Sequence, residues 1–294
     1  MKKKSNFSSA QHASASDVPM FRPPDVPITS SAPHRIARSL TSRPALVVYV
    51  TCGDPNMNAT REIVLAAIRA GADVIELGVP FSDPVADGPV IQRASERALQ
   101  HGTSLQDVLR LAQEIRKESD AGLIVFSYLN PVLHFGLERF CMEAAKAGVD
   151  GALITDLTVE EAGEYRRLMA AHNLDTIFLA APTSPNPRLK AIAEACQGFV
   201  YAVSRTGITG AQKQLASEAG DLVKRIRKFT KLPIAVGFGI SNAEQFVQVG
   251  KFADAAVVGS AIVQTIEQNP GREAQTVAEL ISKMKDGARQ SVGR

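Results

Sequence analysis

Eight short apolar runs alternate with segments of helical periodicity from Ala45 to Gln268. Apolar runs separated by amphipathic helical segments are typical of strands in a parallel sheet whose outer face is covered by helices. Eight such units in succession predict a single (β/α)8 TIM barrel. The expected strands cover residues 45–51, 73–79, 122–128, 151–155, 176–180, 198–203, 233–237 and 253–258.

The segments between these runs predict the helices of the outer layer. They cover about residues 58–70, 90–117, 136–147, 159–172, 187–196, 218–229, 242–249 and 260–268, and extra terminal helices include one over about 272–285 outside the barrel. An open doubly wound sheet is the alternative. The regular succession of units, and the lack of a Gly-x-Gly-x-x-Gly motif after the first run, argue against it.

The rest of the chain narrows the class of protein. Its 294 residues include 33 basic and 30 acidic side chains, and a net charge of +3 gives no reason to expect nucleic acid as a partner.

Residues 1–34 are rich in Ser and Pro, and we expect a disordered tail there rather than an organelle transit peptide. The catalytic barrel is expected over residues 35–290. No apolar run approaches the roughly 20 residues that cross a bilayer, and three isolated cysteines indicate reduced thiols, so we expect a cytoplasmic protein with no membrane partner.

A carboxylate stands in the middle of the second apolar run. Side chains alternate along a strand, so Glu76 faces the barrel interior if Ile75 and Leu77 face the helices. Burying a charge is costly unless it is paired or neutralised, and burial raises a carboxyl pKa toward the range that suits a general acid or base. A structural glutamate bonded to a backbone amide is the alternative.

Two further acids, Asp83 and Asp87, follow in the next loop, where barrel enzymes place their active sites. Asp-Pro and Asp-Gly-Pro are ordinary turn sequences, so each aspartate alone also fits a structural role. Their position directly after a buried glutamate gives the catalytic interpretation about equal weight.

Glycine-rich segments after the last three strands indicate a phosphate site. They are 207–210, 237–241 and 259–260, and the last of them opens a helix. Glycine lets backbone N–H groups approach an anion, and the N-terminus of a helix favours negative charge. Each segment alone fits a tight turn. Together, at the places where barrel enzymes hold phosphate, they predict a phosphorylated substrate.

Aromatic side chains on several strands could line a pocket for a flat apolar ring, although such residues more often belong to the core. They are Tyr49, Phe126, Tyr128, Phe178 and Tyr201. The eight runs contain no lysine for a Schiff base, and neither the histidines nor the strand ends show metal-ligand spacing. The remaining chemistry is acid–base catalysis by carboxylates, with no metal.

The segment from Ile75 to Gln92 resembles the signature of the tryptophan synthase alpha subunit family. Four further motifs extend the resemblance over about residues 35–285: Tyr49–Pro55, Ser204–Ala211, Val236–Ser241 and Val258–Val263. The family cleaves indole-3-glycerol phosphate to indole and glyceraldehyde 3-phosphate, a retro-aldol reaction that needs no cofactor in this chain. The resemblance therefore implies a lyase of tryptophan biosynthesis.

The resemblance also assigns roles to residues. Glu76 would protonate the indole ring at C3 and help to deprotonate the glycerol hydroxyl, while Asp87 would accept a hydrogen bond from the indole N–H. Thr209 resembles the residue that bonds this aspartate when the site closes. The matched phosphate contacts are Gly210, Gly239, Gly259 and Ser260, and the positions at or near the indole pocket are Tyr49, Phe126, Tyr128 and Tyr201.

The family works as an αββα heterotetramer in which the beta subunit uses pyridoxal phosphate and serine. The loop at Asp83–Pro84 and the segment Asp156–Val159 resemble its contact and signalling regions. Two residues depart from the pattern, because Thr158 and Val48 stand where the family commonly has proline. The first departure bears on the contact with the beta subunit.

Three other functions stay open at this stage. A sugar-phosphate isomerase or epimerase would share the glycine-rich segments, but it would lack the motif from Glu76 to Gln92. A non-catalytic subunit kept to activate its partner would not need Glu76 and Asp87. A free-standing lyase would release indole rapidly without a beta subunit.

Overall fold

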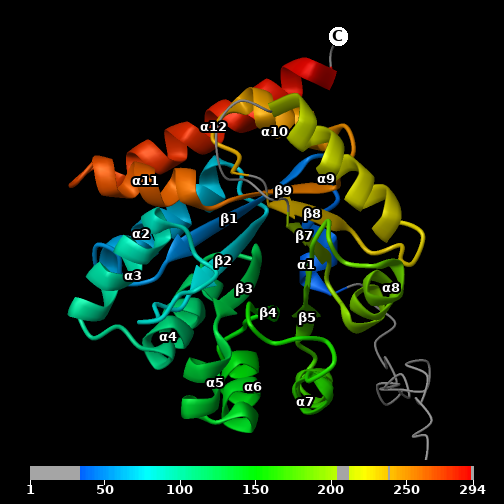
Figure 1. The fold of residues 1–294 in the computed structure, drawn as a ribbon. Coiled ribbons are helices and arrows are strands. Elements are labelled where there is room, and N and C mark those ends of the chain that lie inside the picture. The colour runs from blue at the N-terminus through cyan, green and yellow to red at the C-terminus, as the bar shows by residue number, and fades with distance from the viewer. Residues whose placement is uncertain (1–33, 204–211, 238, 293–294) are drawn as a thin grey trace, which may run out of the picture.

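The computed structural model describes residues 34–203, 212–237 and 239–292. Its strands form one parallel sheet in the order β5-β4-β3-β2-β1-β9-β8-β7-β6, with the helices arranged around it (Figure 1). The strands are β1 (Ala45–Thr51), β2 (Val74–Gly78), β3 (Gly122–Ser127), β4 (Gly151–Ile154), β5 (Asp175–Ile177), β6 (Leu179–Ala180), β7 (Val200–Val203), β8 (Ile234–Gly237) and β9 (Ala255–Val258). This nearly closed parallel sheet confirms the TIM barrel.

The two edges of the sheet are consecutive pieces of one expected strand. The run 176–180 is interrupted at Phe178 and gives β5, which pairs with β4, and β6, which pairs with β7. The backbone N–H of Tyr201 donates to the carbonyl oxygen of Phe178, so pairing continues across the interruption. Nine short strands therefore occupy the eight predicted positions.

The helices follow the expected segments with a few differences. They are α1 (Arg35–Ser39), α2 (Met57–Ala70), α3 (Pro89–Gln100), α4 (Leu105–Arg116), α5 (Leu129–Phe135), α6 (Leu137–Lys146), α7 (Gly163–Ala171), α8 (Asn186–Ala195), α9 (Gln212–Ile226), α10 (Ala243–Gly250), α11 (Ser260–Gln268) and α12 (Glu273–Val292). The last of these packs against α2, α10 and α11 outside the barrel, as expected. Across the described residues, no helix combines the length and the apolar character needed to span a membrane.

The prediction of one helix over 90–117 is wrong, because a turn divides it into α3 and α4. Gly102 takes a left-handed conformation, with φ +72°, which ends the first helix. The hydroxyl of Ser104 then accepts from the backbone N–H of Asp107, whose carboxylate accepts from the backbone N–H of Ser104. This reciprocal capping box starts the second helix.

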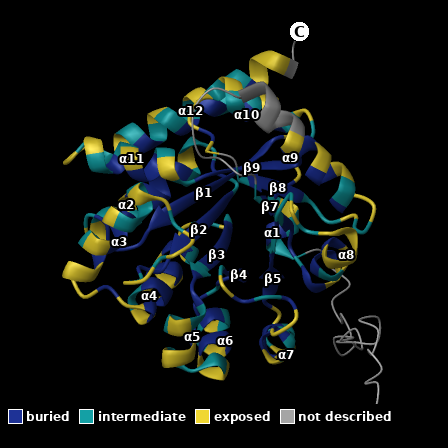
Figure 2. Cartoon of the chain, in the orientation of Figure 1, coloured by how far each residue is buried: buried dark blue, intermediate teal, exposed yellow. Residues whose placement is uncertain are grey.

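Apolar packing occurs on both faces of the sheet. Outward-facing residues such as Ile75 and Leu77 pack under the helices in the larger core, while Val47 and Val74 belong to a smaller cluster inside the barrel. Figure 2 shows this arrangement, with buried strands surrounded by helices that are exposed on their outer faces. The alternation predicted for β2 is thereby confirmed.

Helix α1 closes the N-terminal end of the barrel. Ile36, which is fully buried, packs with Val74 and Ile124 of the interior cluster. Polar contacts hold the helix in place, because Nδ1 of His34 lies 2.5 Å from Oδ1 of Asp175 and Arg35 forms an ion pair with Asp150.

We expect Ile36→Ala to lower the free energy of unfolding by about 2–5 kcal/mol, because it opens a cavity between α1 and the strands. Unfolding in urea, followed by circular dichroism, measures the change. Arg38→Ala, at an exposed position of the same helix, is the control and should change stability by less than about 0.5 kcal/mol. Equal stability of the two variants would show that α1 is not part of the core.

Candidate active site

Glu76 lies in the interior of the barrel. It lies in β2 opposite Tyr49 of β1 and Ile124 of β3, and its side chain is completely buried. Within the described residues neither carboxylate oxygen has a hydrogen-bond partner. Burial raises the pKa of Glu76 to about 8. Near neutral pH this group exists in both protonation states, as a general acid or base requires.

Asp87 lies at the end of the loop after β2 and is held by Tyr128. The Tyr128 hydroxyl donates to Oδ2 of Asp87 at 3.1 Å and accepts from the backbone N–H of Ala86 at 2.9 Å. The ring of Phe81 packs on Tyr128, with centroids 5.2 Å apart. Partial burial raises the pKa of Asp87 to about 6, and the hydrogen bond from Tyr128 opposes that rise. Asp87 is therefore mostly ionised at neutral pH.

Asp83 does not share this environment. It is exposed, and its carboxylate accepts from the neighbouring Ser82 hydroxyl at 2.6 Å. Of the two aspartates in this loop, the turn interpretation is thus favoured only for Asp83.

Two tyrosines pack among the inward-facing residues of the barrel, Tyr49 on β1 and Tyr201 on β7. Burial raises the pKa of Tyr49 well above its usual value, and the charges of Asp87 and Glu76 raise it further. Burial acts in the same way on the pKa of Tyr201, again with contributions from Glu76 and Asp87. Tyr49 is the cross-strand neighbour of Glu76, and the charges of both carboxylates act on the hydroxyls of both tyrosines. Phe126 completes the group and packs edge-on against Tyr49, with centroids 5.1 Å apart.

Glycines make room for these rings, a role that the sequence analysis missed. A Cβ atom at Gly78 would lie 2.4 Å from the hydroxyl of Tyr49, and one at Gly237 would lie 2.7 Å from the ring of Tyr201. A side chain at either glycine would force the neighbouring tyrosine ring to move. The available signal was a glycine at an inward position beside a tyrosine on the neighbouring strand.

The expected phosphate site is described only in part. Gly239 takes a left-handed φ of +59°, and Gly259 is the N-cap of α11 without a side-chain cap. A Cβ at Gly259 would lie 3.5 Å from Cβ of Tyr49, so the start of this helix lies next to that tyrosine. Ser260 begins the helix and is exposed. Thr209 and Gly210 lie outside the described residues.

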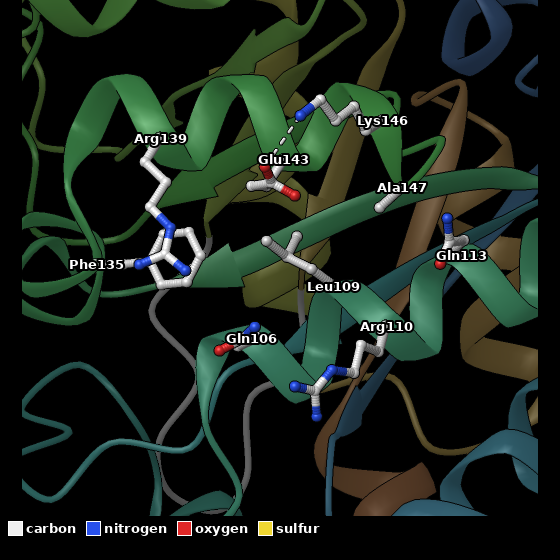
Figure 3. Close-up of a pocket in the computed structure, with 9 residues that line it drawn as sticks. All are labelled: Gln106, Leu109, Arg110, Gln113, Phe135, Arg139, Glu143, Lys146 and Ala147. Atoms are coloured by element: carbon white, nitrogen blue, oxygen red, sulfur yellow. Dashed lines mark hydrogen bonds and ion pairs between the residues drawn. The ribbon is translucent and has the colours of Figure 1, made fainter.

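A separate pocket of about 230 Å³ lies between α4, α5 and α6 (Figure 3). None of the predicted site residues lines it. The guanidinium of Arg139 stacks over the Phe135 ring at 4.2 Å, and Lys146 pairs with Glu143 at 3.2 Å. The one acid in the lining of this pocket is thus paired, whereas Glu76 in the barrel interior has no hydrogen-bond partner within the described residues.

Comparison with known proteins agrees with this geometry. The family model of the tryptophan synthase alpha chain matches residues 37–291. The chain belongs to the tryptophan synthase alpha chain family. This finding confirms the resemblance carried by the motif from Ile75 to Gln92.

Individual members of the tryptophan synthase alpha chain family match most of the chain. The alpha chain of Solibacter usitatus is 54% identical over 78% of this chain and 85% of its own length. That of Neisseria meningitidis serogroup B is 47% identical over 83% and 94%. A solved tryptophan synthase structure from Mycobacterium tuberculosis has a TM-score of 0.80 at 36% identity and covers 88% of this chain and 99% of its own. The alpha subunit of Legionella pneumophila also has a TM-score of 0.80, at 35% identity, and covers 88% of this chain and 100% of its own.

We expect Glu76→Gln to stabilise the protein increasingly as pH rises. Burial raises the pKa of Glu76 in the folded protein to about 8, well above its ordinary value in the unfolded chain. Between these two values the folded protein keeps the proton while the unfolded chain releases it, so the wild type loses stability as pH rises. From pH 5 to pH 8 the stability difference between variant and wild type should grow by about 3 kcal/mol. Urea unfolding at several pH values measures it.

Glu62→Gln, which neutralises an exposed glutamate of α2, is the matched control and should show no such trend. A difference between Glu76→Gln and wild type that stays constant with pH would mean that folding does not raise the pKa of Glu76.

Proposed function

We propose that this chain cleaves indole-3-glycerol phosphate to indole and glyceraldehyde 3-phosphate, with Glu76 and Asp87 as its catalytic residues. The observation that carries the proposal is a fully buried Glu76 that lies opposite Tyr49 and has no hydrogen-bond partner within the described residues, in a tryptophan synthase alpha chain barrel. A sugar-phosphate isomerase or epimerase is disfavoured because the family match extends through the loop that carries Asp87.

Glu76 supplies the proton transfers. Its pKa of about 8 leaves it largely protonated at neutral pH, so it can donate a proton to C3 of the indole ring. The resulting carboxylate then takes the proton of the glycerol hydroxyl. As that hydroxyl becomes the aldehyde, the carbon–carbon bond breaks and its electron pair returns to the ring. The products are neutral indole and glyceraldehyde 3-phosphate, and Glu76 regains its proton.

Asp87 stabilises the intermediate charge. Protonation at C3 leaves positive charge on the indole ring, and an ionised aspartate that accepts from the ring N–H offsets it. With a pKa of about 6, Asp87 is ionised at neutral pH, and the Tyr128 hydroxyl orients it. The two carboxyls thus have opposite protonation states at the same pH, which suits their different roles.

The proposed substrate extends from the side chains of Tyr49, Phe126 and Tyr201 to the start of α11. Tyr49, Phe126 and Tyr201 would contact the indole, with Tyr128 acting through Asp87. The phosphate would bind the backbone N–H groups of Gly239, Gly259 and Ser260, together with Thr209 and Gly210 from the loop after β7. The contact between Gly259 and Tyr49 supports this arrangement because it brings the two ends of the substrate site together.

A beta subunit is the partner that membership of the family implies. We propose an αββα assembly in which the beta subunit holds pyridoxal phosphate and receives the indole in the cytoplasm. The expected contact includes the loop with Val85, which is 86% exposed, and the segment Asp156–Val159. Thr158 donates to Glu161 at 3.1 Å and forms a local turn where the family commonly has proline.

The purified chain should release indole slowly from indole-3-glycerol phosphate, and a tryptophan synthase beta chain should accelerate the release. Colorimetric detection of indole measures both rates. Fast release by the chain alone would indicate a free-standing lyase. No release in either condition, from folded protein, would refute the proposed reaction.

Substitutions should distinguish the two proposed catalytic carboxyls, of Glu76 and Asp87, from the exposed carboxyl of Asp83. We expect Glu76→Gln and Asp87→Asn each to lower kcat by 100-fold or more, because each removes a group that acts on the transition state. Asp83→Asn, in the same loop but exposed, is the matched control and should stay within about twofold in the isolated chain. More than a tenth of wild-type activity in Glu76→Gln would rule out its acid–base role.

A further inference from the structure

Arg97 of α3 joins three elements through a planar set of hydrogen bonds. Its Nε and Nη2 atoms donate to the two carboxylate oxygens of Asp54, each at 2.8 Å. Its Nη1 atom donates to Oε1 of Glu267 in α11, also at 2.8 Å. A bidentate pair of this kind fixes orientation as well as distance, which a lysine cannot do.

Asp54 provides a rigid anchor. It is 3% exposed and lies in the loop after β1, where its backbone N–H donates to the carbonyl of Thr51. The neighbouring Gly53 receives support from Thr60, whose hydroxyl accepts from its backbone N–H at 3.1 Å. A carboxylate this deeply buried depends on its cation, because removing one partner leaves an uncompensated charge.

The strand order explains why one side chain can reach both helices. In the sheet, β1 lies between β2 and β9. Helix α3 follows β2 and the Asp87 loop, whereas α11 follows β9, so the loop after β1 stands between the two. Arg97 and Glu267 lie eight and seven residues beyond the first residues of their helices. The bridge therefore holds both helices roughly two turns from their N-termini.

Those N-termini border the proposed substrate site. Asp87 stands two residues before α3, and Gly259 is the N-cap of α11. Ala94 of α3 and Val263 of α11 pack with Tyr49 in one buried cluster. A shift of one helix against the other would change the spacing between Asp87 and the start of α11.

We propose that Arg97 is a positioning residue that sets the spacing between Asp87 and the phosphate-binding end of α11. It contacts neither carboxyl of the proposed chemistry, and the proposal rests on the proposed function. Its effect is on the alignment of the indole end of the substrate when the phosphate end is bound. Misplacement by about 1 Å is enough to lower a rate by up to 100-fold.

Arg93 provides a matched control on the same helix. It also pairs with Glu267, through Nε at 2.9 Å and Nη2 at 2.7 Å, but it is half exposed and has no contact with Asp54. Hydrogen bonds from Arg93, and then from Arg97, hold the pKa of Glu267 at about 2. Removing Arg93 keeps α3 tied to α11 and to the loop after β1 through Arg97.

The test compares Arg97→Lys with Arg93→Ala in the full chain bound to a beta chain, with indole-3-glycerol phosphate as substrate. We expect Arg97→Lys to lower kcat at least 10-fold, with KM within threefold and an unchanged melting temperature. Arg93→Ala should keep kcat within twofold. If Arg97→Lys does not fold, Asp54→Asn is judged by the same criteria.

The outcomes are distinct. A kcat of Arg97→Lys within twofold of wild type, or a raised KM at unchanged kcat, would overturn the proposal. If wild type itself releases no indole, the proposed function fails, and hydrogen exchange then decides the positioning role. Faster exchange over residues 84–94 in Arg97→Lys, absent in Arg93→Ala, supports positioning, and equal exchange in both variants overturns it.

Discussion

The alternation of side chains along the parallel strands of the barrel is the constraint on which the site depends. It sends Leu77 outward under the helices and Glu76 inward, where the described residues offer it no hydrogen-bond partner. A carboxyl in that position is stable mainly when protonated, which raises its pKa to about 8. The same geometry that forms the core therefore produces an acid that can exchange its proton at neutral pH.

The environment of Asp87 gives its carboxyl a lower pKa than that of Glu76. It lies only eleven residues further along the chain, yet it sits on a loop and receives the hydroxyl of Tyr128, so its pKa rises only to about 6. Full burial sets the pKa of Glu76, whereas partial burial and the hydrogen bond from Tyr128 set the pKa of Asp87. Two carboxyls of ordinary chemistry thus acquire separate protonation states through their positions in the fold.

Much of this could be predicted from the sequence because it depends on local pattern. The strand runs, the inward direction of Glu76 and the family followed from periodicity and one long motif. The turn that separates α3 from α4 was missed, although Gly102 and Ser104 are local signals. Arg97 could not be found in this way, because its partners Asp54 and Glu267 are 43 and 170 residues away. Contacts of that range follow from the strand order and not from neighbouring residues. Roles at Thr209 and Gly210 remain predictions.

Helix α1 limits how a small molecule can reach the interior of the barrel. Ile36 and Leu40 fill the interior at its N-terminal end, and contacts of His34 with Asp175 and of Arg35 with Asp150 hold them there. Within the described residues, this end of the barrel is therefore closed to a small molecule on its way to Glu76. Under the proposed function, substrate and products share the other end, so each new substrate molecule waits for the departure of the previous products.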